Sequence, residues 1–268
     1  TAQLIKHLPR STIMMGVPTF YVRLLLDPNF NQSVCKNMRL FVSGSAPLLT
    51  ETFNTFQKVS GHTILERYGM SETVMLVSNP YQGSRVGGSV GVPLPGVEVR
   101  VVNESGSPCG VNEIGAIEVR GPNIFKGYWR MPEKTAETII DGWLHTGDRG
   151  LIDERGFLYL KDRLKDIVIT GGFNVYPVDV ENALSQHPAV HECLVFGLPD
   201  EKWGETVQAA VQLHPGKRAD EAELIAFVRN LLGPVQTPKH VHFYESLPRS
   251  NVGKLLKSAV IQKLQTPA

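Results

Sequence analysis

The strongest constraint on the fold is the alternation of short apolar runs with helical patterns over roughly the first 80 residues. Buried strands are predicted at 11–17 (STIMMGV) and 38–43 (MRLFVS), and a helix at 48–59 begins directly after Pro47. A further strand at 62–69 (HTILERYG) ends in a loop. Strands that alternate with helices in this way form βαβ units on a mainly parallel sheet. Ligands of such sheets usually bind in the loops that follow the carboxyl ends of the strands.

The pattern changes to period-two strands from about residue 85 onward. Strands separated by Gly and Pro turns are predicted at 96–103 (GVEVRVVN), 113–121 (EIGAIEVRG) and 127–129 (GYW), and the pattern continues at 156–162 (GFLYLKD). Short strands with polar alternation are typical of a small antiparallel barrel or sheet.

The last hundred or so residues predict a compact α+β unit, a size typical of a domain. Its expected elements are a helix at 177–186, strands at 190–197 and 206–213, a helix at 219–232, a strand at 240–244 and a helix at 254–264.

The predicted fold class is therefore α/β and α+β, in two domains. The first spans 1–162, with a parallel α/β part at about 1–82 and a barrel-like part at about 83–162. The second spans 163–268. The charged stretch from Asp162 to Lys165 separates them, and so short a linker acts as a hinge and not as a tether.

Composition excludes several classes of function. The chain has 268 residues and a formal charge of +1, so nothing in its charge favours nucleic acid or an anionic membrane as a partner. Three well-separated cysteines make neither a disulfide framework nor a zinc ligand set, and they suit a reducing compartment such as the cytoplasm. No apolar run approaches the ~20 residues of a membrane span. The chain begins with Thr1, so a targeting peptide would lie upstream.

Two loops at predicted strand ends carry polar groups that a core does not need. The small residues of SGSAPL (43–48) let a flat ring or a phosphate lie against the backbone, although Ser-Gly-Ser is also an ordinary turn. ERYGMSET (66–73) offers the ring of Tyr68, the hydroxyl of Ser71 and the carboxylate of Glu72, a set that suits a nucleoside triphosphate with magnesium. The alternative is a loop in which Ser71 caps a helix.

Three further segments point to ligand binding, each with a structural alternative. In GWLHTGD (142–148), Asp148 can accept both hydroxyls of a ribose, or it is simply a turn residue. In DIVITGGFNVYP (166–177), the double glycine forms either a tight turn or a slot lined by backbone. In LPRSNVGKLLK (247–257), Lys254 is predicted to open a helix, where its ammonium can stabilise developing negative charge or remain solvated.

Five motifs together resemble the later core motifs of the adenylate-forming superfamily of acyl-CoA synthetases, luciferases and peptide-synthetase adenylation domains. They are SGSAPL, RYGMSET, HTGD, DRLKDIVITGGFNVYP and PRSNVGKLLK, in that order over essentially the whole chain. Within the superfamily, the segments MGVPTFYVRLL, LERYGMSET and GPNIFKGYWRMPEKT are most similar to malonyl-CoA synthetases. The resemblance implies a large AMP-binding domain followed by a mobile C-terminal lid.

The resemblance also implies the roles of individual residues. Lys254 would be the catalytic lysine of adenylation, Glu72 the magnesium ligand, Lys165 the hinge, and Gly171 with Gly172 the lining of a tunnel for the pantetheine arm of CoA. The nucleotide site would comprise Ser43, Gly44, Ser45, Ala46, Glu66, Arg67, Tyr68, Gly69, Met70, Ser71, Asp148 and Arg163.

The expected activity is formation of malonyl-CoA or methylmalonyl-CoA from the dicarboxylate, ATP, Mg²⁺ and CoA. Arg67 is the expected partner of the second carboxylate, because a buried unpaired charge is expensive; alternatively, it pairs with Glu66 or Glu51. The family's phosphate loop precedes all these motifs and is absent from these residues, so this chain alone is expected to be inactive. The other candidates are a medium-chain or aryl acyl-CoA ligase and a non-catalytic nucleotide-binding fragment.

Overall fold

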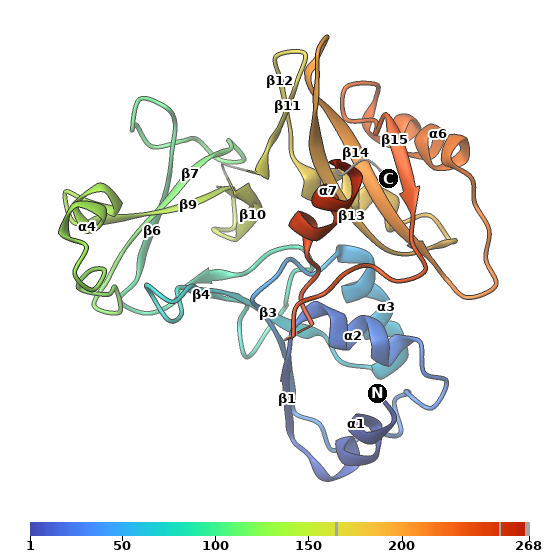
Figure 1. The fold of residues 1–268 in the computed structure, drawn as a ribbon. Coiled ribbons are helices and arrows are strands. Elements are labelled where there is room, and N and C mark those ends of the chain that lie inside the picture. Colours follow the sequence, from blue (N-terminus) through green and yellow to red (C-terminus); the bar gives the residue numbers. More distant parts are fainter. Residues whose placement is uncertain (164–165, 252, 266–268) are drawn as a thin grey trace. The chain divides into compact units, whose positions relative to one another are not determined.

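The computed structural model describes residues 1–163, 166–251 and 253–265, with the side chains of 162 and 163 outside that description. The chain forms two compact units, Thr1–Leu160 and Lys161–Ala268 (Figure 1). Lys165, the predicted hinge, lies outside the described residues. None of the helices in the described part is long and apolar enough to cross a membrane.

The first unit begins with a five-stranded sheet in the order β1-β2-β3-β4-β5. The strands β1 (Ile13–Gly16), β2 (Leu40–Ser43) and β3 (Ile64–Tyr68) are parallel, as their alternation with helices predicted. The short strands β4 (Val77–Ser78) and β5 (Val92–Pro93) then extend the sheet in antiparallel register.

Helices α2 (Pro18–Leu25) and α3 (Thr50–Ser60) pack on this sheet through aromatic side chains, after α1 (Ala2–His7) and a 3₁₀ turn at Leu8–Arg10. The ring of Tyr21 on α2 lies 5.3 Å from the ring of Phe56 on α3 and 6.5 Å from that of Phe41 on β2. The Tyr21 hydroxyl donates to the carbonyl of Val42 at 2.5 Å, so α2 fixes the backbone at the carboxyl end of β2. Helix α2 was not predicted, although Pro18 stands in its first turn.

A second, antiparallel sheet follows in the order β10-β9-β7-β6, with β8 paired to β9, and its strand β10 runs across the boundary between the two units. Its strands are β6 (Glu98–Val102), β7 (Gly115–Arg120), β8 (Ile139–Ile140), β9 (Trp143–Ile152) and β10 (Leu158–Arg163). The strands in the described part pair as an open sheet, so of the two predicted forms the sheet is found and the closed barrel is not.

The strand predicted at 127–129 is wrong. Gly127 has a φ of +146°, which turns the chain there, and Trp129 is 85% exposed. The Tyr128 N–H donates to the Thr135 hydroxyl at 2.9 Å and not to a neighbouring strand. Helix α4 (Pro132–Thr138) follows.

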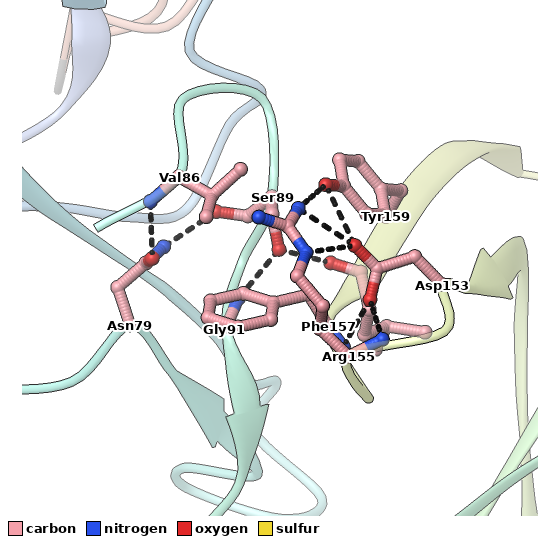
Figure 2. Close-up of polar contacts among 9 residues, drawn as sticks. Asn79, Val86, Ser89, Gly91, Asp153, Arg155, Phe157 and Tyr159 are labelled. Carbon is pink, nitrogen blue, oxygen red and sulfur yellow. Dashed lines mark hydrogen bonds and ion pairs between the residues drawn. The ribbon is translucent and has the colours of Figure 1, made fainter. Parts of the chain in front are cut away.

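A buried polar network joins the two sheets of the first unit (Figure 2). The amide of Asn79 donates to the carbonyl of Ser89 at 2.6 Å, and the Ser89 hydroxyl donates to the carbonyl of Leu158 at 2.8 Å. Gly91 is forced to be glycine, since a Cβ there would lie 2.0 Å from the carbonyl of Ser78 and its φ is +100°. The segment between the sheets is thereby anchored to β10.

The second unit has a five-stranded sheet in the order β12-β11-β14-β13, with β15 parallel to β14. The core of this unit consists of two hydrophobic clusters, one on each face of the sheet, and β13 contributes to both with alternate residues. Cys193 and Val195 pack in the cluster with α5 and α6, whereas Leu194 and Phe196 pack in the cluster with α7. The elements are β11 (Val168–Thr170), β12 (Phe173–Val175), α5 (Pro177–Leu184), β13 (Val190–Asp200), β14 (Gly204–Leu213), α6 (Glu221–Leu232), β15 (His240–Phe243) and α7 (Lys257–Gln265). The order of helices and strands predicted for this α+β unit is confirmed, except that strand β12 was not predicted.

Candidate functional site

The end of β2 brings the SGSAPL loop next to the end of β3. Ser43 pairs with Glu66 across the two parallel strands, and the Ser43 hydroxyl is buried without a hydrogen-bond partner among the described residues. Beyond it, Ser45 has a φ of +68° and Ala46 is exposed. The loop therefore leaves the sheet with backbone and small side chains at the strand edge, and with an unsatisfied hydroxyl beneath them.

Arg67 lies against Gly44, because a Cβ at Gly44 would be only 3.3 Å from its Cγ. Its Nη1 donates to the sulfur of Met75 at 3.6 Å, and its buried Nε has no partner in the part of the chain that the structure describes. The alternative prediction, in which Arg67 pairs with Glu66 or Glu51, is wrong within the described residues. The Glu66 carboxylate accepts from the N–H of Gly88, and the Glu51 carboxylate accepts from the hydroxyl of Thr55. The guanidinium therefore has unused hydrogen-bonding capacity.

Glu66 is buried on the opposite side of β3 from Arg67. Its carboxylate accepts a hydrogen bond from the N–H of Gly88 at 3.2 Å. Burial raises the pKa of Glu66 to about 8, although the hydrogen bond from Gly88 acts in the opposite direction. At neutral pH this side chain is largely uncharged, so it is a hydrogen-bonding group and not a counter-ion for Arg67.

Tyr68 and Asp148 meet, although they are 80 residues apart in sequence: the Tyr68 hydroxyl donates to Oδ2 of Asp148 at 2.5 Å. Asp148 does not lie in a turn, as the alternative supposed. It lies within β9, where the register against β7 shifts and Gly147 has a φ of +76°. This irregularity aims Asp148 toward Tyr68, and Thr146 supports it by accepting from the Asp148 N–H at 3.1 Å.

The loop after β3 carries the remaining candidates of the first unit. A Cβ at Gly69 would lie 2.2 Å from the carbonyl of Val74, so the loop folds back closely on itself. Ser71 is exposed and Glu72 is half-buried. Sequence reasoning missed Tyr128, whose hydroxyl donates to Oε1 of Glu72 at 2.9 Å. Its position after Gly127 in an apparent strand hid that role.

The carboxylate of Glu72 fits magnesium bound together with a nucleotide. The described residues contain no group of three or more His, Cys, Asp or Glu side chains that could hold a metal by themselves. Magnesium is commonly held by one or two carboxylates together with substrate phosphates and water, so a lone half-buried carboxylate suits it.

In the second unit, Gly171 and Gly172 form the two-residue turn of the β11–β12 hairpin, with φ of +57° and +82°. The tight turn is therefore present. A Cβ at Gly171 would lie 2.9 Å from the Trp203 ring, whereas a Cβ at Gly172 would meet nothing within 4 Å. The open side of this turn is at Gly172.

Lys254 does not open a helix, since α7 begins at Lys257. It closes a tight turn with Ser250: the Lys254 N–H donates to the Ser250 hydroxyl at 3.1 Å, and the Ser250 N–H donates to the Lys254 carbonyl at 2.8 Å. Arg249 beside this turn pairs with the buried carboxylate of Glu192 on β13, which anchors the Lys254 backbone to the sheet. Arg163 ends β10, and its side chain is outside the description.

Two family models match this chain, AMP-binding enzyme over residues 2–129 and AMP-binding enzyme C-terminal domain over residues 179–254. The chain belongs to the AMP-binding enzyme family. This confirms the predicted membership of the adenylate-forming superfamily.

Solved structures of other proteins share the fold of this chain. The ATP-bound crystal structure of MatB from Rhodopseudomonas palustris has a TM-score of 0.93 and 46% sequence identity, covering 98% of this chain and 52% of that chain. The amide bond synthetase McbA from Marinactinospora thermotolerans has a TM-score of 0.89 and 33% identity, covering 99% and 55%.

Curated proteins similar to this chain include several ligases. The chain is 42% identical to a long-chain-fatty-acid–CoA ligase of Bacillus subtilis, over 96% of this chain and 46% of that protein. It is 37% identical to the malonate–CoA ligase ACSF3, mitochondrial, of Mus musculus, over 96% of this chain and 49% of that protein. The chain thus spans about half the length of the curated relatives it matches.

Proposed function

We propose that the full-length protein is an ATP-dependent acyl-CoA synthetase that forms malonyl-CoA or methylmalonyl-CoA through an acyl-adenylate. The observation that carries this proposal is the state of Arg67, which lies beside the Ser43–Ala46 loop. Its buried Nε has no hydrogen-bond partner among the described residues. A substrate with a second carboxylate supplies the missing charge-assisted partner. The similarity to MatB and to a malonate–CoA ligase supports the same substrate class.

The nucleotide is assigned to the strand ends of the first unit. The Tyr68 ring and the Ser43–Ala46 backbone would enclose adenine, the Asp148 carboxylate would accept from the ribose hydroxyls together with Arg163, and the Ser71 hydroxyl would bind a phosphate oxygen. The Tyr68–Asp148 hydrogen bond orients the carboxylate before ATP arrives. Glu66, Gly69 and Met70 complete this proposed nucleotide site.

Glu72 would hold magnesium with the ATP phosphates. Bound there, the metal would neutralise phosphate charge during the first half-reaction. The protein's own contribution is to present one carboxylate from a loop held by residues 123–128.

The proposed chemistry has two half-reactions. A carboxylate oxygen attacks the α-phosphorus of ATP and the bond to pyrophosphate breaks, giving the acyl-adenylate. The CoA thiol releases its proton to solvent, its sulfur attacks the acyl carbon, and the bond to AMP breaks so that AMP leaves. Lys254 would stabilise negative charge in the first step, and the Gly171–Gly172 turn would admit the pantetheine arm in the second. We assign the second unit as a lid that turns near Lys165 between the steps.

The test compares malonate, methylmalonate and acetate as substrates of the full-length protein, by pyrophosphate release. Malonate or methylmalonate is expected to be preferred. Arg67→Leu is expected to lower kcat/KM for the dicarboxylate by about 100-fold and to spare acetate, because it leaves the second carboxylate unpaired. The exposed Arg39→Leu serves as the control. A preference for acetate in the unmodified enzyme removes the dicarboxylate assignment.

The second candidate is a ligase for a longer or aromatic acid, in which Arg67 only packs against Gly44. It is favoured by the similarity to a long-chain-fatty-acid–CoA ligase and to the anthranilate–CoA ligase AuaEII, whose structure is 29% identical with a TM-score of 0.87. Octanoate and benzoate in the same assay distinguish it. Absence of pyrophosphate release with every acid indicates the third candidate, a non-catalytic nucleotide-binding protein.

A further inference from the structure

The Glu72 side chain is contacted by a segment that is distant in sequence. Tyr128 lies between β7 and α4, and its hydroxyl donates to Oε1 of Glu72 at 2.9 Å. The two residues are 56 positions apart, so only the tertiary fold brings them together. One carboxylate oxygen of Glu72 is therefore already engaged before any ligand is bound.

The same segment also holds the backbone around Glu72. The Asn123 amide donates to the carbonyls of Thr73 and Met75, at 2.8 and 2.9 Å, and the N–H of Phe125 donates to the carbonyl of Glu72 at 2.8 Å. We call residues 123–128 the clamp. It fixes the main chain at Glu72 and directly after it, as well as the carboxylate itself.

Tyr128 is itself held in place from α4 and within the clamp. Its N–H donates to the Thr135 hydroxyl at 2.9 Å, and its ring lies 4.8 Å from the Phe125 ring at an edge-to-face angle of 75°. The Lys134 ammonium lies 4.7 Å from the centre of the Tyr128 ring. The phenol is thus oriented by packing and not by solvent, as a group that positions another side chain must be.

A carboxylate that binds a metal alone has rotational freedom, which a hydrogen bond to one of its oxygens removes. Partners of this kind commonly change metal affinity or activity by about 10–100-fold when they are mutated. From these contacts we infer that Tyr128 is a positioning residue, which orients the Glu72 carboxylate for the magnesium ion of Mg·ATP. The inference rests on the proposed function, in which Glu72 is the magnesium ligand.

The test is Tyr128→Phe in the full-length protein, with Tyr159→Phe as the matched control. Tyr159 is also a tyrosine of the first unit whose hydroxyl bonds a carboxylate, that of Asp153 at 3.3 Å (Figure 2). Calorimetric titration with ATP is carried out with and without Mg²⁺. Tyr128→Phe is expected to weaken magnesium-dependent ATP binding about tenfold and to leave the metal-free binding unchanged. The magnesium concentration for half-maximal pyrophosphate release should also rise about tenfold in Tyr128→Phe. Tyr159→Phe should change neither the magnesium-dependent ATP binding nor this magnesium concentration.

A purely structural role for Tyr128 predicts a lower unfolding temperature with unchanged magnesium dependence, and this result overturns the inference. The inference is also overturned if Tyr128→Phe weakens magnesium-dependent ATP binding by the same factor in the Glu72→Gln variant as in the unmodified protein. If Tyr128 acts by positioning Glu72, the effects of the two substitutions do not add. Thr135→Val releases the Tyr128 backbone from α4, and it should shift the magnesium dependence in the same direction if Tyr128→Phe does not fold. If unmodified protein binds no ATP, or binds it equally well without magnesium, the proposed function fails instead.

Discussion

At the scale of single residues, burial has changed the chemistry of Glu66. Its carboxyl lies in the interior of the first unit with a backbone hydrogen bond, and its pKa is raised from 4.5 to about 8. Arg67, the next residue, points away from it and keeps an unsatisfied nitrogen. Two neighbouring residues on one strand therefore present a nearly neutral acid to one side and a cation to the other, as the period of a strand requires.

Glu66 gives the first unit a pH-dependent stability. The folded state binds the Glu66 proton more tightly than the unfolded state does, so its contribution is complete below about pH 4.5 and is lost as the pH rises toward 8. The slope attributable to Glu66 is at most about 1.4 kcal/mol per pH unit. Glu66→Gln should remove this decline, because the amide oxygen still accepts from Gly88 and carries no charge.

Urea unfolding midpoints of Glu66→Gln and unmodified full-length protein, measured between pH 5 and 8.5, check this prediction. The variant should gain relative stability as the pH rises. Glu113→Gln is the control, because exposed Glu113 also accepts from a backbone N–H, that of Gly110 at 2.8 Å. Parallel pH curves for Glu66→Gln and unmodified protein would show that Glu66 ionises normally.

At the scale of elements, the β11–β12 hairpin gives its two glycines different surroundings. Gly171 is needed for packing, since its N–H donates to the Trp203 carbonyl at 2.8 Å and a Cβ would meet the Trp203 ring. Gly172 faces open space. The tight turn is therefore present, and it leaves open space at Gly172, where the backbone-lined slot remains a proposal.

Gly172→Ala should slow the thioester half-reaction about tenfold or more and leave adenylation unchanged, because its methyl group projects where the pantetheine arm is proposed to pass. Gly216→Ala is a matched control in the same unit: its φ is +76°, against +82° for Gly172, and neither has an atom within 4 Å of its Cβ position. Single-turnover rates with presupplied acyl-adenylate and CoA measure the effect. Equal slowing by both variants would mean that backbone strain, and not blockage, is responsible.

At the scale of the whole molecule, the proposed machinery is divided between the two units. Tyr68, Glu72 and Asp148 belong to the first, and Gly172 and Lys254 belong to the second. Each unit has its own sheets and core. This division suits two half-reactions that need different groups at one acyl carbon.

Lys254→Ala tests that division of labour. Loss of one preorganised charge stabiliser should slow adenylation by about 10²–10³-fold and largely spare thioester formation from presupplied acyl-adenylate. Pyrophosphate release and CoA-thioester formation are followed separately in the full-length protein. The control is Lys263→Ala on α7, a lysine whose ammonium lies 5.3 Å from the centre of the Tyr244 ring. An equal loss in both half-reactions contradicts the assignment of Lys254 to the first step.

The order of motifs and the spacing of apolar residues were enough to predict the parallel strands β1–β3, the α+β second unit and the family. Hydrophobic periodicity and glycine positions are local properties, so they can be recognised in the sequence without knowledge of the fold. Local patterns failed at residues 127–129, where the Tyr128 N–H donates to the Thr135 hydroxyl, and at Lys254, whose backbone bonds to Ser250 before α7 begins.

Only the tertiary structure decided which side chains meet. Tyr68 contacts Asp148 because β9 shifts its register against β7, and Glu72 is held by the clamp, which follows β7. Arg67 is unpaired among the described residues because the neighbouring acids bond elsewhere. Contacts between distant segments depend on strand register and loop closure, which no local pattern in the sequence specifies.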